Sequence, residues 1–80
     1  MDELQRRILE ALERVSNNPD WANLHTIWEQ CGSEPLGTFR RAWDVLEENG
    51  YVEGDIHSGL IIAGTGRITG AGEQALKDQG

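Results

Sequence analysis

The sequence predicts a small α+β domain in which helices come first and a hairpin of strands follows. Two observations carry this prediction. Apolar side chains recur at helical spacing within residues 33 to 52, on one face of a helix: Leu36, Phe39, Ala42, Trp43 and Leu46. After Tyr51 the pattern changes to β-favouring residues broken by glycines. The change falls at Asn49 and Gly50, which tolerate the positive φ at which helices commonly end.

Length and composition predict one domain, residues 1 to 80, with a small core. A chain of 80 residues buries only about 60–65% of the surface that its unfolded form exposes. Its single cysteine excludes an intrachain disulfide, and no Cys/His cluster supplies the four ligands of a structural zinc site. We therefore expect no metal and no cofactor. The longest apolar run, residues 60 to 63, is too short to cross a bilayer, so we expect a cytoplasmic protein with no membrane partner.

The first helix is expected over residues 2 to 16. Asp2 is its candidate cap, and one face is apolar: Leu4, Ile8, Ala11, Leu12 and Val15. Acid-before-base pairs four residues apart, Glu3 with Arg7 and Glu10 with Arg14, are expected to stabilise it. Residues 16 to 19 favour a turn before proline and should end the helix.

A second helix is expected from about residue 22 to residue 31, with Asp20 or Asn23 as its cap. Trp21 precedes it and can lie in a short extended segment that pairs with later strands. Gly32 ends this helix, and Ser33 is the expected cap of the third, with Pro35 in its first turn. So short a link predicts a steep crossing, as in a helix-turn-helix unit.

The C-terminal part is expected to form a hairpin and a last short helix. The hairpin tip lies either at residues 57 to 59 or at residues 63 to 66; the glycines permit both, and we favour the second. Residues 60 to 62 are expected to be extended. Thr69 should cap a helix over residues 71 to 78. The expected core comprises Leu12, Ile27, Phe39, Trp43, Leu46, Val52, Ile68 and Leu76.

Two stretches, FRRAWDVLEENGYVEG and RITGAGEQAL, resemble the winged helix-turn-helix family, and the likeness covers residues 22 to 76. It implies a single winged-helix domain: a three-helix helix-turn-helix core, a β-hairpin wing and a short C-terminal helix. Small members of this kind occur in prokaryotes, phages and plasmids. Because winged helices serve as DNA readers, dimerisation modules and adaptors, the resemblance predicts fold more sharply than function.

DNA binding, as a small transcriptional regulator, is the leading function that the resemblance implies, with the third helix in the major groove of double-stranded DNA. Gly37, Thr38, Arg40 and Arg41 are then the candidate contacts on that helix, and Arg67 is the candidate on the wing. Arg41 would read a base, while Arg40 and Arg67 would hold the backbone. A homodimer is expected in this case, because two-fold symmetry sets two half-sites.

The charge of the chain favours another hypothesis. Fourteen acids against seven bases give a net charge of −7, which repels phosphate polymers unless the bases gather on one side. Asp44 follows Arg40 and Arg41 at spacings that allow pairing within the helix. The alternative is an acidic winged-helix module for protein–protein interaction or dimerisation that binds no DNA. Its partner would be a basic protein, and Trp21 is the candidate partner contact.

No residue pattern in the sequence predicts catalysis, so we expect no enzyme. Cys31 lies on the apolar stripe of the second helix, as expected for a small buried side chain. His25 and His57 lie far apart, without a metal-ligand spacing or a nucleophile to activate. The surface charge should separate the two remaining hypotheses. A positive band through the three candidate arginines favours DNA, whereas arginines separated by carboxylates favour a protein partner.

Overall fold

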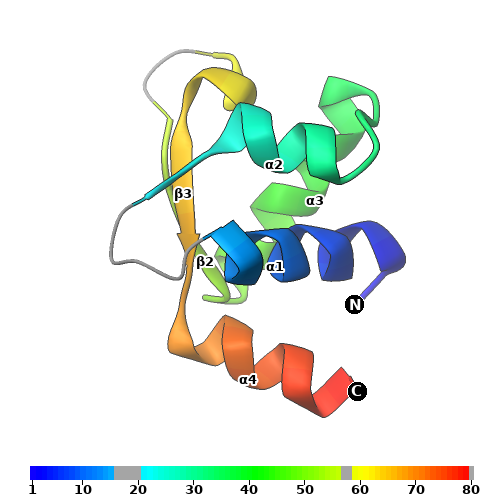
Figure 1. Cartoon of the computed structure of the whole chain (residues 1–80), viewed down its shortest axis with the longest axis vertical. Coiled ribbons are helices and arrows are strands. Elements are labelled where there is room, and N and C mark those ends of the chain that lie inside the picture. The colour runs from blue at the N-terminus through cyan, green and yellow to red at the C-terminus, as the bar shows by residue number, and fades with distance from the viewer. Residues whose placement is uncertain (16–20, 57–58, 80) are drawn as a thin grey trace.

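The computed structural model describes residues 1–15, 21–56 and 59–79, and in this part it confirms the predicted α+β class (Figure 1). Four α-helices accompany a three-stranded antiparallel sheet. The elements in chain order are α1 (Glu3–Val15), β1 (Ala22–Asn23), α2 (Leu24–Gln30), α3 (Leu36–Glu48), β2 (Val52–Asp55), the 3-10 turn η1 (Ile61–Ala63), β3 (Thr65–Ile68) and α4 (Gly70–Gln79). None of the helices in the described part combines the length and the apolar character that a membrane span requires.

The sheet joins segments that are distant in the sequence. Its strand order is β1-β3-β2, so the central strand β3 pairs with both others. Val52 lies opposite Ile68, and Ala22 lies opposite Gly66. A short extended segment that pairs with a later strand is therefore present as β1, but it begins at Ala22 and leaves out Trp21, which was expected in it.

Helix α1 has the expected start and one of its two expected ion pairs. The carboxylate of Asp2 accepts a hydrogen bond from the Gln5 amide at 2.8 Å, as a capping residue should. Glu3 pairs with Arg7 at 3.0 Å. The pairing of Glu10 with Arg14 is wrong. Glu10 pairs instead with Arg6 at 3.5 Å.

Arg14 has another partner because it lies in the last turn of α1, beside the packed helix α2. Its guanidinium donates to the side chain of Gln30 at 3.4 Å. The expected helix-ending turn at residues 16 to 19 and the candidate cap Asp20 lie outside the described residues.

The link between α2 and α3 differs from the prediction. Asn23 caps α2 by accepting from the His25 amide at 2.9 Å, so the helix begins after β1 rather than at residue 22. Ser33 does not cap α3, which begins three residues later with Pro35 at the cap position. Instead, Ser33 has a φ of 52° and its amide donates to the Trp28 carbonyl at 3.1 Å. Ser33 therefore helps to end α2.

The favoured hairpin tip at residues 63 to 66 is wrong, because Thr65 and Gly66 are already paired with β2. The other candidate tip includes residues 57 and 58, which lie outside the described residues. Residues 60 to 62 do not form a strand either. The Ala63 amide donates to the Leu60 carbonyl in the 3-10 turn, which turns Ile61 into the core and leaves Leu60 outside.

The core lies between α1, α2, α3 and the sheet, and α1 also packs against α4. Six of the eight expected core residues are buried, whereas Ile68 and Leu76 are half-buried at its edge. Thr69 caps α4 as expected: its hydroxyl accepts from the Gly72 amide at 3.1 Å and donates to the Gly50 carbonyl at 2.7 Å. That helix begins at Gly70, one residue earlier than expected.

Candidate functional site

An apolar groove lies where the start of α3 meets the connection between β2 and β3. We call it the α3/η1 groove, and its volume is about 220 Å³. It is lined by Leu36, Gly37, Arg40, Gly59, Leu60 and Ile61. Ile61 is buried, while Leu36 and Leu60 remain 36% and 57% exposed. Two leucines therefore flank an open groove. The groove lies at the N-terminal end of α3, which is the part of the helix that the DNA hypothesis assigns to base contacts.

The arginine at this groove is engaged within its own helix. The Nε of Arg40 donates to the Asp44 carboxylate at 3.1 Å, across one turn of α3. This pairing is the one that the spacing allowed. Because each side chain is nearly half exposed, the pair adds little to stability, but it leaves a carboxylate beside the guanidinium wherever a phosphate would approach.

The arginine of the wing is held even more closely. Arg67 and Glu53 lie opposite each other on β3 and β2. The guanidinium donates to the Glu53 carboxylate, with N···O distances of 2.7 and 2.8 Å. Its central carbon also lies 5.0 Å from the ring centroid of Trp21, within the range of a cation–π contact. Trp21 is 40% exposed, as expected for a partner contact, but Arg67 lies over its ring.

Arg41 is the exception among the three candidate arginines. It is exposed, and it has no ion-pair partner within the described residues. It lines a second hollow, of about 350 Å³, together with Thr38 and side chains of α1. The structure thus brings Gly37, Thr38, Arg40 and Arg41 together on the first two turns of α3. Arg67 lines neither hollow.

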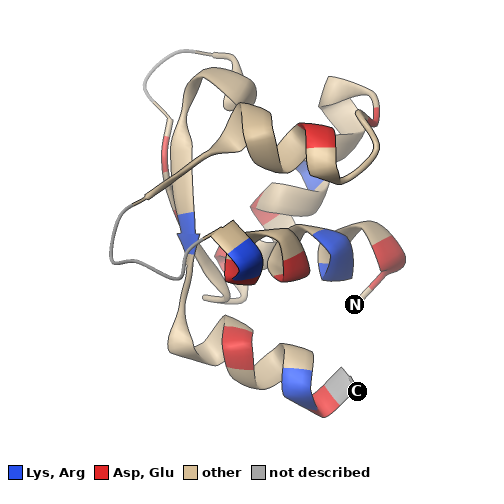
Figure 2. Cartoon of the chain, in the orientation of Figure 1, with Lys and Arg blue, Asp and Glu red and all other residues tan. Residues whose placement is uncertain are grey.

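Basic residues do not gather on one side of the ribbon. Figure 2 shows Lys and Arg interspersed with Asp and Glu along the helices. Two of the three candidate arginines carry a carboxylate at ion-pair distance. The positive band that would favour DNA is therefore broken at both ends.

Sequence reasoning did not predict the groove or the exposure of Leu36, although it predicted that the apolar run of residues 60 to 62 exposes a side chain. Leu36 belongs to the apolar stripe of α3 and was expected inside, but it lies in the first turn, which the rest of the core does not reach. For Leu60 a signal existed, since three consecutive apolar residues in an extended segment must expose one side chain. The 3-10 turn that exposes Leu60 was not visible in the pattern.

Reactive chemistry is not evident in the described residues. Cys31 is buried as expected, and burial raises the pKa of its thiol to about 11, although Arg7 and Arg14 act in the opposite direction. A neutral, inaccessible thiol is a poor nucleophile. No group of three or more potential metal ligands occurs in the described part of the chain.

Comparison of the chain with protein-family models, with curated proteins and with solved structures gave no match. Function is therefore inferred from the arrangement of side chains. The described residues include one apolar groove flanked by exposed leucines, two arginines bound to carboxylates of the same chain, and one arginine, Arg41, for which they supply no such partner.

Proposed function

We propose that the chain is a winged-helix domain that acts as an acidic protein-interaction module. The order of elements supports the fold, since a helix and a short strand precede two closely linked helices, a two-stranded hairpin and a last helix. The pairing of β1 with β3 supports it as well. We place this function in the cytoplasm, because a chain with one cysteine needs no oxidising compartment.

The α3/η1 groove carries the functional part of the proposal. Exposed leucines on both sides of an open groove gain free energy when a partner covers them, by up to about 1.5–3 kcal/mol for a fully buried side chain. Phosphate and sugar offer no such gain. Leu36 and Leu60 are therefore suited to a protein surface, and Ile61 provides an apolar floor.

Electrostatics supports the same choice. A DNA backbone that contacted Arg40 and Arg67 would have to displace Asp44 from the first and Glu53 from the second, and both carboxylates would then face phosphates. With a net charge of −7, the whole molecule opposes such an approach. A basic protein meets no such barrier, since opposite charge speeds and orients its encounter. We therefore infer a partner with an apolar anchor for the groove and basic residues around it.

Peptide selection tests the proposal. Random peptides displayed on phage are selected on the wild-type protein, and the enriched peptides are synthesised and measured by isothermal titration. We expect apolar anchors flanked by Lys or Arg, and we expect Leu36→Asp or Leu60→Asp to weaken binding at least about tenfold. Val15→Asp is the matched control, because Val15 is a similarly exposed residue at the end of α1. Enriched peptides that bind the Leu60→Asp variant as well as the wild type would refute the groove as the site.

Double-stranded DNA remains the second candidate partner, because one observation favours it. Arg41 is exposed and free of an ion pair in the described residues, and Gly37 and Thr38 lie beside it on the same end of α3. If this end enters the major groove, Arg41→Ala should reduce the slope of log affinity against log salt by about 1 when it contacts phosphate. If it reads a guanine instead, the same variant should relax sequence preference.

A further inference from the structure

A second surface lies on the side of α3 that faces away from Leu36. Four exposed residues follow one another along this side at helical spacing: Thr38, Arg41, Val45 and Glu48. We call them the outer α3 stripe. Val45, which is 36% exposed, is its apolar centre. Arg41 lies one turn before Val45 and Glu48 one turn after it, and neither has an ion-pair partner in the described part of the chain.

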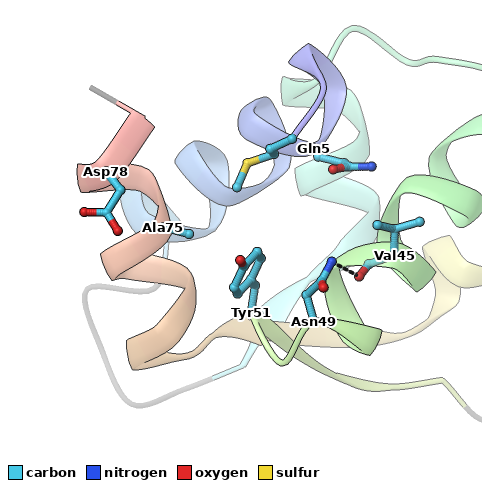
Figure 3. Close-up of a pocket in the computed structure, with 7 residues that line it drawn as sticks. Gln5, Val45, Asn49, Tyr51, Ala75 and Asp78 are labelled. Carbon is cyan, nitrogen blue, oxygen red and sulfur yellow. Dashed lines mark hydrogen bonds between the residues drawn. The ribbon is translucent and has the colours of Figure 1, made fainter.

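The surface around Val45 is wider than the stripe. Val45 and Gln5 line two hollows at once, so the two hollows form one continuous surface between α1, α3 and α4. The larger hollow has a volume of about 390 Å³. Figure 3 shows Val45 and Asp78 on opposite sides of it, with Tyr51 between them. Met1, which is 43% exposed, also lines it, and Leu4 lines the smaller hollow.

We infer that this surface binds a second copy of the chain in a two-fold contact, with the two α3 helices antiparallel and crossing at Val45. In such a contact each surface meets itself, so a group before the centre of one helix faces a group after the centre of the other. Arg41 of each copy then faces Glu48 of the second copy. Along the stripe a basic residue, a valine and an acidic residue follow one another. This order makes the stripe complementary to itself in a two-fold contact.

The charge of the stripe identifies the occupant. One base and one acid give it no net charge, although the whole chain carries −7. A basic partner would favour a stripe of acids, whereas a self-contact between acidic stripes would repel. Two further carboxylates line the hollows beside the stripe, and each accepts a hydrogen bond within the chain: Asp2 from the Gln5 amide, and Asp78 from the Gln74 side chain.

The end of α3 supplies a second, independent argument. Glu47 and Glu48 lie in its last turn, at the negative end of the helix dipole, and this turn contains no basic residue. Within one copy, that placement is unfavourable. A guanidinium from a second copy at Glu48 compensates both the carboxylate and the helix end.

This contact is separate from the proposed docking of a basic protein, since the α3/η1 groove lies on the other side of the helix. It also covers Arg41. A dimer of this kind therefore removes from solvent the one candidate arginine that has no partner in the described residues.

Analytical ultracentrifugation from micromolar to millimolar protein tests the inference. We expect the weight-average mass to rise from 8.9 kDa toward twice that value. Val45→Glu should abolish the rise. Arg41→Glu and Glu48→Arg should each weaken the dimer at least about tenfold, and the double variant, which exchanges the two charges, should restore it.

A charge control makes the test sharper. Glu13→Arg changes the net charge by the same amount as Glu48→Arg, at an exposed position on the far side of α1 from Leu4. If only overall repulsion mattered, both variants would strengthen self-association. We expect Glu48→Arg to weaken it and Glu13→Arg not to do so. Thermal melts monitored by circular dichroism check that each variant is folded. A wild-type protein that stays monomeric throughout, or a double variant that fails to recover, would overturn the inference.

Discussion

Trp43 shows at the scale of single residues why two glycines belong in the strands. Gly54 and Gly66 lie opposite each other on β2 and β3, and the indole packs against both. A Cβ added at Gly66 would lie 2.5 Å from the ring, and one added at Gly54 would lie 2.9 Å from its Nε1. The glycines therefore make room for the largest side chain of the core. Sequence reasoning treated them as breaks in a β pattern, and Gly66 also as part of the favoured hairpin tip.

Gly66→Ala should destabilise the fold by about 1–3 kcal/mol, because the methyl group forces Trp43 or the sheet to move. The matched control is Gly37→Ala on α3, where an added Cβ meets nothing within 4 Å. There the same change should stabilise by up to about 1 kcal/mol, since alanine favours a helix over glycine. Urea denaturation measures both. Equal effects at the two positions would show that Trp43 does not press against this strand.

Cys31 predicts a loss of stability at high pH. Burial raises the pKa of its thiol from the ordinary value of 9.0 to about 11 in the folded chain, so the thiol ionises first in the unfolded chain. Its contribution is therefore intact below about pH 9 and is lost as pH rises toward about 11, by roughly 2–3 kcal/mol. Urea melts of wild type and Cys31→Ala across this range isolate the thiol, because other groups titrate in both proteins. Parallel pH curves would contradict the assignment.

At the scale of elements, the Thr69 side chain links the start of α4 to the turn that follows α3 by hydrogen bonds. Its hydroxyl caps α4 and also donates to the Gly50 carbonyl. Thr69→Ala should cost about 1–2 kcal/mol, because both hydrogen bonds are lost, whereas Thr69→Ser should retain most of the stability. Chemical denaturation compares the two variants. A serine variant as unstable as the alanine variant would show that the methyl group, rather than the hydroxyl, is responsible.

Helix α3 should be the least tolerant element of the chain. Phe39 and Leu46 are fully buried on its inner face. Truncating either to alanine should cost about 2–5 kcal/mol, a large share of the 5–15 kcal/mol typical of a whole domain. Leu36→Ala, on the same helix but 36% exposed, serves as the control and should cost less. Thermal unfolding measures all three, and a Phe39/Leu46 double variant with a cooperative melt would contradict the core assignment.

The elements that were predictable are those specified by local pattern. Periodicity located α1 and α3, and capping chemistry located the start of α4 at Thr69. The burial of Ile61 by the 3-10 turn and the pairing of Arg14 with Gln30 depend on packing between distant segments. No local pattern records these contacts, so the sequence did not predict them.

In the candidate site, too, local contacts were predictable from the sequence and contacts between distant segments were not. The pairing of Arg40 with Asp44 followed from their spacing on one helix. The contacts of Arg67 with Glu53 and Trp21 required the register of β2 on β3 and the position of β1, neither of which the sequence specified. Consequently the three arginines of the DNA hypothesis could be named from the sequence, but the neutralisation of Arg67 could only be seen in the structure.

At the scale of the whole molecule, we propose that the acidic surface, which shows no continuous positive band in the described residues, serves protein partners. Four of its seven bases form ion pairs within the chain in the described part of the structure. Such pairs leave few free cations to replace the counterions of DNA. The overall charge and the apolar α3/η1 groove therefore both favour a protein partner over DNA.

Fluorescence anisotropy of a labelled, mixed-sequence DNA duplex at low salt tests this claim most directly. Low salt favours every phosphate contact that the protein can make. We predict no rise in anisotropy at micromolar protein, and no difference between the wild type and Arg41→Ala. Saturable binding that weakens steeply with added salt and is lost in Arg41→Ala would contradict the claim and establish the start of α3 as a DNA-binding surface.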